Sequence, residues 1–172
     1  FSFWYLAISL SFILFITYII LSVFSYSNAV SSEISNSVFR LHVIANSDSN
    51  EDQNLKYLVR DNIINYMNSI SYNCKTKKEA IELAKTNINE FKQIALETIK
   101  NEGYDYDVNI EIGNFYFPTK QYGDISFPSG NYDALKIEIG EAIGQNWWCV
   151  MFPSLCFIDI DSGYVSDSSK KL

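Results

Sequence analysis

The sequence predicts an α+β domain preceded by an apolar N-terminal helix, and three features of its 172 residues support this prediction. First, residues 1–24 form an uncharged and mostly apolar run. Second, two stretches with apolar residues at three- and four-residue spacing follow one candidate strand. Third, several stretches rich in β-branched and aromatic residues come after these helices. One strand, two helices and then about four strands are typical of helices packed on a mainly antiparallel sheet.

Residues 1–24 are predicted to enter a membrane. No charged side chain occurs before Glu33, and the run is longer than the roughly 20 apolar residues that a bilayer core requires of a helix. Signal peptides have shorter apolar cores of about 7–15 residues, but Ser27 and Ala29 are small residues of the kind that a signal peptidase reads. A cleaved signal and a retained transmembrane anchor therefore both remain open. The first basic residue is Arg40, which favours a C-terminal part outside the cytoplasm.

Residues 25–37 are polar and rich in Ser and Asn, so we expect them to link the membrane segment to a domain over residues 38–160. Residues 161–172 are predicted to form a polar tail. The domain begins with a strand over residues 38–45. Because both faces of this strand carry apolar side chains, we expect it to lie inside the sheet.

Two amphipathic helices are predicted next, the first ending near Ile70 and the second running without interruption to about Asn101. Capping residues support both starts. The candidate pairs are Asp48 with Glu51 or Ser49 with Asp52 for the first helix, and Thr76 with Glu79 for the second. The later strands are predicted over residues 106–112 with a continuation over 114–117, then 134–139, 147–152 and 157–160, with a connection over 118–128.

The only histidine of the chain, His42, precedes the polar residues Asn46, Ser47 and Asp48. A catalytic triad needs a base in contact with its nucleophile and an acid that orients the base. An exported hydrolase that uses His42, Ser47 and Asp48 is therefore one hypothesis. Ser47 and Asp48 are equally suited to starting a helix, and no Gly-x-Ser-x-Gly elbow occurs. We prefer the structural interpretation of these residues.

A second enzyme hypothesis uses Asp161, because Asp161-Ser162-Gly163 follows an apolar run as in aspartic proteases. One copy would need a dimer to supply the second carboxylate, and the tripeptide is also ordinary turn chemistry. One histidine and three separated cysteines predict no metal site, and no cofactor or small-molecule substrate is expected. The net charge of −7 argues against nucleic acid. The preferred interpretation is an exported binding or signalling domain that is not an enzyme.

Trp147 and Trp148 are neighbours in a predicted strand, so their rings point to opposite faces of the sheet. One ring would enter the core, while the other covers a second surface that belongs either to the domain or to a partner. Cys149 and Cys156 are close in sequence, and a disulfide between them would leave Cys74 unpaired. Three reduced cysteines are the alternative.

Several long and irregular strings resemble the stage II sporulation protein R family of endospore-forming bacteria. The strings are FRLHVIANSD over residues 39–48, FPTK over 117–120, FPSG over 127–130, YDAL over 132–135 and NWWCV over 146–150. The similarity covers about Val38 to Asp159. Ser154 stands where the family usually has a second Pro, and the family continues beyond Leu172 into a further helix and strand, so a shorter variant and a fragment are both open.

The resemblance implies a signalling role. Family members are made in the forespore and exported into the space between the forespore and mother-cell membranes. There they trigger a membrane-bound aspartic protease of the mother cell, which removes the pro-sequence of sigma-E. The family offers no catalytic residues to carry over. We expect the partner surface on the two longest strings, at His42, Asn46, Ser47, Asp48, Trp147, Trp148 and Cys149.

Overall fold

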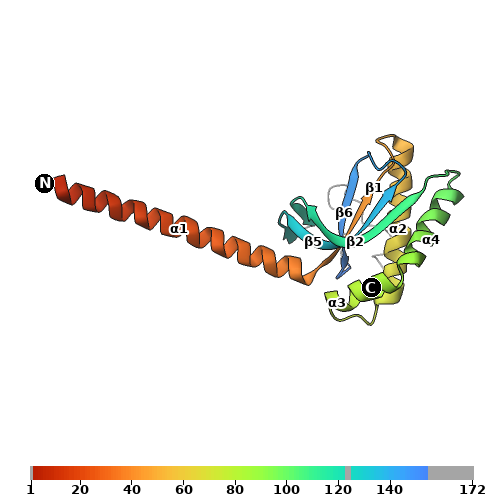
Figure 1. Ribbon diagram of the computed structural model, residues 1–172, viewed down its shortest axis with the longest axis horizontal. Helices are drawn as coiled ribbons and strands as arrows, with labels where there is room; N and C mark the ends of the chain where they lie inside the picture. The colour runs from red at the N-terminus through yellow and green to blue at the C-terminus, as the bar shows by residue number, and fades with distance from the viewer. Residues whose placement is uncertain (1, 123–124, 155–172) are drawn as a thin grey trace. The chain divides into compact units, whose positions relative to one another are not determined.

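The computed structural model describes residues 2–122 and 125–154, and the chain divides into two compact units between Ile34 and Ser35 (Figure 1). The first unit is helical. It consists of most of helix α1, which extends over Ser2–Ser37 and so ends just inside the second unit.

The apolar part of α1, Phe3–Tyr26, is 24 residues long and apolar enough to cross a membrane. Its large apolar side chains are exposed, as they must be for contact with lipid. The apolar helix predicted in front of the domain is therefore present. Residues 25–37, which we predicted as a linker, continue the helix, because they contain neither Gly nor Pro to end it.

The second unit contains a four-stranded mixed sheet with the strand order β2-β5-β1-β6. β1 pairs in parallel with β5, whereas β1 with β6 and β2 with β5 are antiparallel. The predicted α+β class is confirmed, and the first strand lies inside the sheet as expected. The strands of this sheet are β1 (Phe39–Ile44), β2 (Val108–Phe117), β5 (Gly130–Ile139) and β6 (Asn146–Phe152).

Three helices follow one another between β1 and β2, where the sequence predicted two. They are α2 (Asn50–Ser71), α3 (Lys77–Thr86) and α4 (Ile88–Asn101). The predicted second helix was wrong in being continuous, because Asn87 interrupts it. The Asn87 Nδ2 donates to the Leu83 carbonyl oxygen at 2.8 Å, and Oδ1 accepts from the Tyr66 hydroxyl at 3.0 Å. Such side-chain bonds compete with the helical backbone.

The predicted connection over residues 118–128 contains a second, two-stranded sheet, formed by β3 (Lys120–Tyr122) and β4 (Ile125–Phe127). We call β3 and β4 the hairpin. β2 runs without a break through Gly113, and β5 begins earlier than predicted, because the ladder between β2 and β5 is regular from end to end. The predicted strand over residues 157–160 and the polar tail lie outside the described residues.

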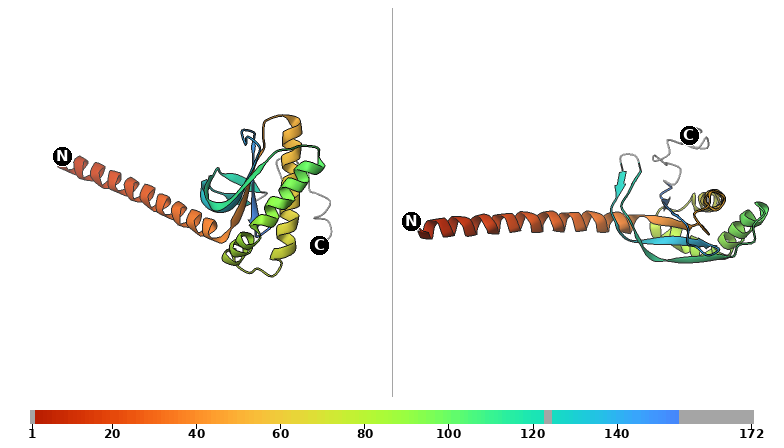
Figure 2. Two further views of the ribbon diagram at one scale, coloured as in Figure 1. Left: turned by 45° about the vertical axis from the view of Figure 1, so that its right-hand side comes forward. Right: turned by 90° about the horizontal axis from the view of Figure 1, so that it is seen from above.

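The two faces of the four-stranded sheet have different neighbours. On the first, which we call the helix face, Trp147 contacts α2 and Asp133 is ion-paired with Lys77 of α3. On the second, which we call the hairpin face, Arg40 contacts Tyr122 and Phe127 of the hairpin. Figure 2 shows the helices and the hairpin from two further directions. Because side chains alternate along a strand, each sheet position belongs to one face.

Candidate functional site

Pairing between β1 and β6 brings the two longest family-like strings together. His42 lies opposite Trp148, and Ile44 lies opposite Asn146. The two strings are separated by most of the domain in sequence, so this contact exists only in the folded chain. It places four of the seven predicted site positions on two neighbouring strands, at His42, Trp147, Trp148 and Cys149.

His42 is held as a neutral base on the hairpin face. The residue is 7% exposed, and its ring stacks on Trp148 with 3.8 Å between ring centroids and 19° between planes. Nε2 donates to Oδ1 of Asn146 at 2.7 Å, and Nδ1 is buried without a hydrogen-bond partner among the described residues. Burial lowers the pKa of His42, and the bond to Asn146 opposes this change without cancelling it. The imidazole is therefore uncharged at neutral pH.

Arg40 is a fully buried cation on the same face. Its Cζ lies 4.1 Å from the ring centroid of Phe117 and 4.7 Å from that of Tyr132. Nη2 donates to the Tyr122 hydroxyl at 3.2 Å, and Nε donates to the Cys149 carbonyl oxygen at 3.5 Å. Nη1 has no hydrogen-bond partner in the described part of the chain. Burial lowers the pKa of Arg40, and interactions with Tyr122 oppose this change without cancelling it. The ring faces of Phe117 and Tyr132 add cation–π contacts that stabilise the charge.

Aromatic rings connect Arg40 to His42 and Trp148. The Phe117 ring contacts Trp148 edge to face at 4.8 Å and His42 at 5.9 Å between centroids. The Tyr122 hydroxyl donates to the Trp148 carbonyl oxygen at 2.8 Å, which attaches the hairpin to β6. Arg40 was not among the site residues predicted from the sequence. The sequence feature that could have revealed it is a charged residue within a strand that has apolar residues on both faces.

Trp147 points to the helix face, as its position beside Trp148 predicted. Arg60 of α2 lies over its ring, with 4.2 Å between Cζ and the ring centroid, and Tyr57 meets the ring edge to face at 5.5 Å. Trp147 is half-buried, and its indole Nε1 is buried without a hydrogen-bond partner among the residues described. The pair therefore places one ring on α2 and the other on His42.

The polar residues after β1 hold the start of α2. Ser49 is the N-cap, and its Oγ accepts from the backbone N–H of Asp52 at 3.1 Å. The Asp52 carboxylate accepts from Ser47 Oγ at 2.5 Å and from Asn46 Nδ2 at 2.8 Å. Burial raises the pKa of Asp52, but these bonds and one from Tyr106 outweigh it, so the pKa lies below its ordinary value. Of the two predicted capping pairs, Ser49 with Asp52 is the one that forms.

Asn46 and Ser47 also fix the loop between β5 and β6. The Asn46 Oδ1 accepts from the Glu141 backbone N–H at 2.9 Å. Gly140 has a positive φ of 57°, and a Cβ on it would collide with this Oδ1. A Cβ on Gly144 would collide with the carbonyl oxygen of Ser47. Asn46 and Ser47, which were predicted as site residues, therefore have a structural role: they pack closely against the loop between β5 and β6.

Five predicted site residues keep surface that a partner can reach. Asp48 is exposed, and the half-buried ones are Asn46, Ser47, Trp147 and Trp148. Cys149 is fully buried and disulfide-bonded, whereas Cys74 is a free thiol. The predicted partner Cys156 lies outside the described residues, so the Cys149–Cys156 pairing stays a prediction.

Lys56 of α2 was not recognised in the sequence. Its side chain is 1% exposed, and Nζ donates to Gln53 Oε1 at 2.5 Å and to the Gln145 carbonyl oxygen at 3.1 Å. Burial, and next the nearby charge of Arg60, lower the pKa of Lys56 to about 8. The amine thus joins α2 to the segment that leads into β6. In the sequence Lys56 occupies one polar position of an amphipathic helix, which normally faces water.

The described residues do not assemble a hydrolase site around His42. His42 bonds to Asn146, while Ser47 Oγ donates to Asp52, so base and nucleophile have different partners. Asp161, the residue of the second enzyme hypothesis, lies outside the described residues. No group of three or more His, Cys, Asp or Glu in the described ranges is placed to hold a metal ion.

Comparison with protein families matches residues 35–162 to the family described as stage II sporulation protein R. The chain belongs to this family. The matched range contains β1 to β6 and therefore both of the strings that pair across β1 and β6. The family resemblance noted in the sequence is confirmed.

A curated relative in this family is stage II sporulation protein R of Bacillus subtilis (strain 168). It is 38% identical to the chain over 130 residues, which are 76% of this chain and 58% of the relative. The chain thus aligns with little more than half of that protein's length. No solved structure matches the chain.

Proposed function

We propose that this protein is an exported signalling protein of sporulation that activates a membrane-embedded aspartic protease of the mother cell and so starts the processing of pro-sigma-E. Membership of the stage II sporulation protein R family is the observation that carries the proposal. The homology supports a role in sporulation. The protease and its substrate come from what the family resemblance implies.

The proposed location is the space between the forespore and mother-cell membranes. The helix Phe3–Tyr26 supports export, either as an anchor that stays in the forespore membrane or as a signal that is removed. In both cases the domain is displayed on the outer side of that membrane. A protease in the facing mother-cell membrane is then within its reach.

We infer that the partner surface includes Asp48 and Trp148, with His42, Asn46, Ser47, Trp147 and Cys149 holding them in place. Asp48 is exposed beside the α2 cap, and Trp148 is half-buried against His42. Aromatic residues dominate many protein interfaces, and a free carboxylate adds charge selectivity. The two groups belong to the two strings that meet where β1 pairs with β6.

Replacement of either Asp48 or Trp148 is expected to weaken the signal. Asp48→Ala and Trp148→Ala should each reduce processing of pro-sigma-E at least about tenfold, because interface residues of this kind contribute about 1–2 kcal/mol or more. Near-ultraviolet circular dichroism and urea unfolding establish that each variant is folded. If both folded variants trigger full processing, this surface assignment is wrong.

Co-expression tests the proposed function. The chain, the mother-cell protease and pro-sigma-E are produced in a host that lacks other sporulation proteins, with and without the chain. We expect cleavage of pro-sigma-E only when the chain is present and exported. Absence of cleavage with a folded, exported chain contradicts the proposal for these 172 residues. A chimera that adds the C-terminal part of the Bacillus subtilis relative then shows whether length is the cause.

A further inference from the structure

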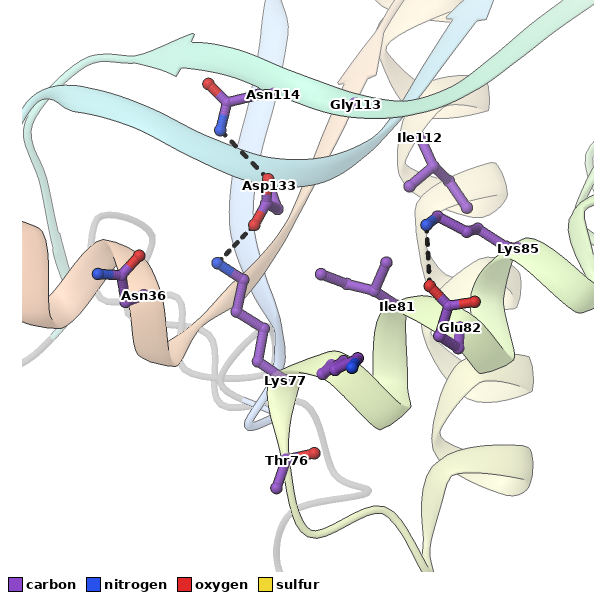
Figure 3. A pocket seen from close by; sticks show the side chains of 11 residues that line it. Asn36, Thr76, Lys77, Ile81, Glu82, Lys85, Ile112, Gly113, Asn114 and Asp133 are labelled. Atoms are coloured by element: carbon purple, nitrogen blue, oxygen red, sulfur yellow. Dashed lines mark hydrogen bonds and ion pairs between the residues drawn. The ribbon is translucent and has the colours of Figure 1, made fainter.

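A groove of about 610 Å³ lies between helix α3 and the outer part of the sheet (Figure 3). Ile112–Asn114 of β2 form one wall, and Lys77, Ile81 and Lys85 of α3 belong to the other. Figure 3 shows Asp133 of β5 between these walls, directed toward Lys77. Its carboxylate is ion-paired with Lys77 Nζ at 2.6 Å. The groove therefore runs alongside a strand and a helix, the arrangement in which extended peptides add to sheets.

The strand beside the groove is the edge of the sheet. β2 pairs with β5 on one side, and no described strand pairs with it on the other. The Asp107 carbonyl oxygen accepts from the Gly140 N–H at 2.9 Å, in line with the β2–β5 register. Hydrogen-bonded pairs recur at every second residue of an antiparallel ladder. The backbone groups of Ile112 and Asn114 therefore point outward, and both residues line the groove.

This edge lacks most of the usual protections against strand addition, and Glu111 is its one charged side chain. β2 contains no Lys and no Pro, and its ladder with β5 has no bulge. Proteins commonly block edge strands with such features, because an open edge is a template for a further strand. The groove leaves room for the side chains of an added strand on the side that faces α3.

The helical wall of the groove is basic, in a chain whose net charge is −7. Lys77, Lys78 and Lys85 line it, against the acidic Glu82 and Asp133. Lys85 and Glu82 form an ion pair at 2.9 Å in which both side chains are largely exposed, so water screens it. Lys78 is exposed and forms no ion pair within the described part of the chain. The charge of the wall favours an acidic occupant.

We infer that this groove binds an extended, acidic segment of a partner protein as an added strand of the sheet. The segment pairs with the outer edge of β2 and places carboxylates against the lysines of α3. This inference deepens the proposed function and rests on it for the identity of the partner as the receiver of the signal. A second copy of the chain fits less well, because it would bring the lysines of two α3 helices onto one continuous sheet face.

Matched variants separate the two parts of the interaction. Asn114→Pro removes the outward N–H, whereas Asn114→Ala removes the same side chain and its 3.2 Å bond to Asp133 but keeps the N–H. Lys78→Glu reverses the one charge of the wall that has no described ion pair, and Lys92→Glu on α4 is a control for net charge. Urea unfolding of each variant establishes that it is folded.

The probe is a fluorescein-labelled, strand-length peptide of alternating Glu and Val, with a peptide of alternating Lys and Val as its control. Fluorescence anisotropy is measured with the full chain in detergent micelles. We expect the Glu peptide alone to bind, with affinity reduced at least about tenfold by Asn114→Pro and by Lys78→Glu. Asn114→Ala and Lys92→Glu should change it less than about threefold.

Four outcomes overturn the inference, three of them in the binding measurements. These three are no binding of the Glu peptide to the folded chain, equal binding by the Asn114→Pro and Asn114→Ala variants, and Lys78-dependent binding to phosphatidylglycerol vesicles in place of the peptide. A β2-dependent dimer seen by analytical ultracentrifugation, with no peptide binding, also overturns it in favour of a second copy. The peptide measurement does not use the protease. A failed co-expression assay therefore contradicts the proposed function but does not test whether the groove binds an acidic strand.

Discussion

The neutral state of His42 links the stability of the domain to pH. Burial holds the pKa of His42 below 6.5 in the folded protein, while the unfolded chain has the ordinary value. As pH falls, the unfolded chain takes up the proton first, so the stabilisation is complete above pH 6.5 and is lost toward the folded pKa. We expect the free energy of unfolding to fall in that window by up to about 1.4 kcal/mol per pH unit.

Urea unfolding followed by tryptophan fluorescence, between about pH 5 and pH 8, measures this dependence. The His42→Gln variant keeps a hydrogen-bonding side chain but cannot titrate, so its free energy of unfolding should depend less on pH in this window. Carboxylates other than Glu138, which interacts with His42, contribute the same background to both proteins. Equal pH dependence in the two proteins would show that His42 is not held neutral.

Lys56 makes the stability of the domain depend on pH in the alkaline range. Its folded pKa is about 8, below the ordinary 10.5, so the folded state carries an unfavourable charge below pH 8. As pH rises from 8 to 10.5, the folded amine loses its proton before the unfolded one and this penalty disappears. We expect Lys56→Met to raise the free energy of unfolding by about 1–3 kcal/mol near pH 7 and by much less near pH 10.5. Thermal unfolding at both pH values, with Lys92→Met as an exposed control, tests this.

Single residues were the least predictable part of the site. The capping role of Ser49 and the opposite directions of Trp147 and Trp148 follow from local rules on helix ends and strands. Arg40 and Lys56 are buried by partners that lie far away in the chain, and no local rule contains such contacts. Whether a charged side chain is buried depends on the assembled fold, so the burial of these two residues could be recognised only in the structure.

At the scale of secondary structure, the conformation of the loop between β5 and β6 requires a glycine at position 140, because a Cβ there would collide with Asn46. Gly140 and Gly103 both have positive φ, but a Cβ would meet Asn46 at Gly140 and nothing within 4 Å at Gly103. We expect Gly103→Ala to cost about 1 kcal/mol for backbone strain alone, and Gly140→Ala to cost about 2–4 kcal/mol. Comparison of the two variants by urea unfolding isolates the effect of the contact. Equal costs would mean that the loop moves aside freely.

The elements of the fold were predictable where the periodicity was long. The apolar helix, α2 and the strands of the four-stranded sheet follow from their spacing of apolar residues. The break at Asn87 was missed because its hydrogen bond comes from Tyr66, on another helix. The hairpin was missed because strands as short as β3 and β4 carry too few residues for a pattern, and contacts with Arg40 stabilise them instead.

At the scale of the whole molecule, the apolar helix is expected to hold the chain in a membrane. Two arginines at its centre, Leu14→Arg with Phe15→Arg, should cost about 5–7 kcal/mol of insertion free energy. The same change near its end, Ser25→Arg with Tyr26→Arg, should cost far less, because the side chains reach the interface. The fraction of full-length chain that resists alkaline extraction from membranes measures this. Equal extraction of both variants would contradict a spanning helix.

The strand order β2-β5-β1-β6 has a consequence for the time course of folding. β1 is synthesised first among the strands, yet both of its neighbours, β5 and β6, come from the end of the domain. Such long-range pairing delays folding until the late strands exist, because the intervening chain must first be closed into a loop. The sheet therefore assembles after synthesis has passed Phe152. This order of assembly suits a protein that is exported, because a nascent chain that has not yet folded can be threaded through a translocation channel.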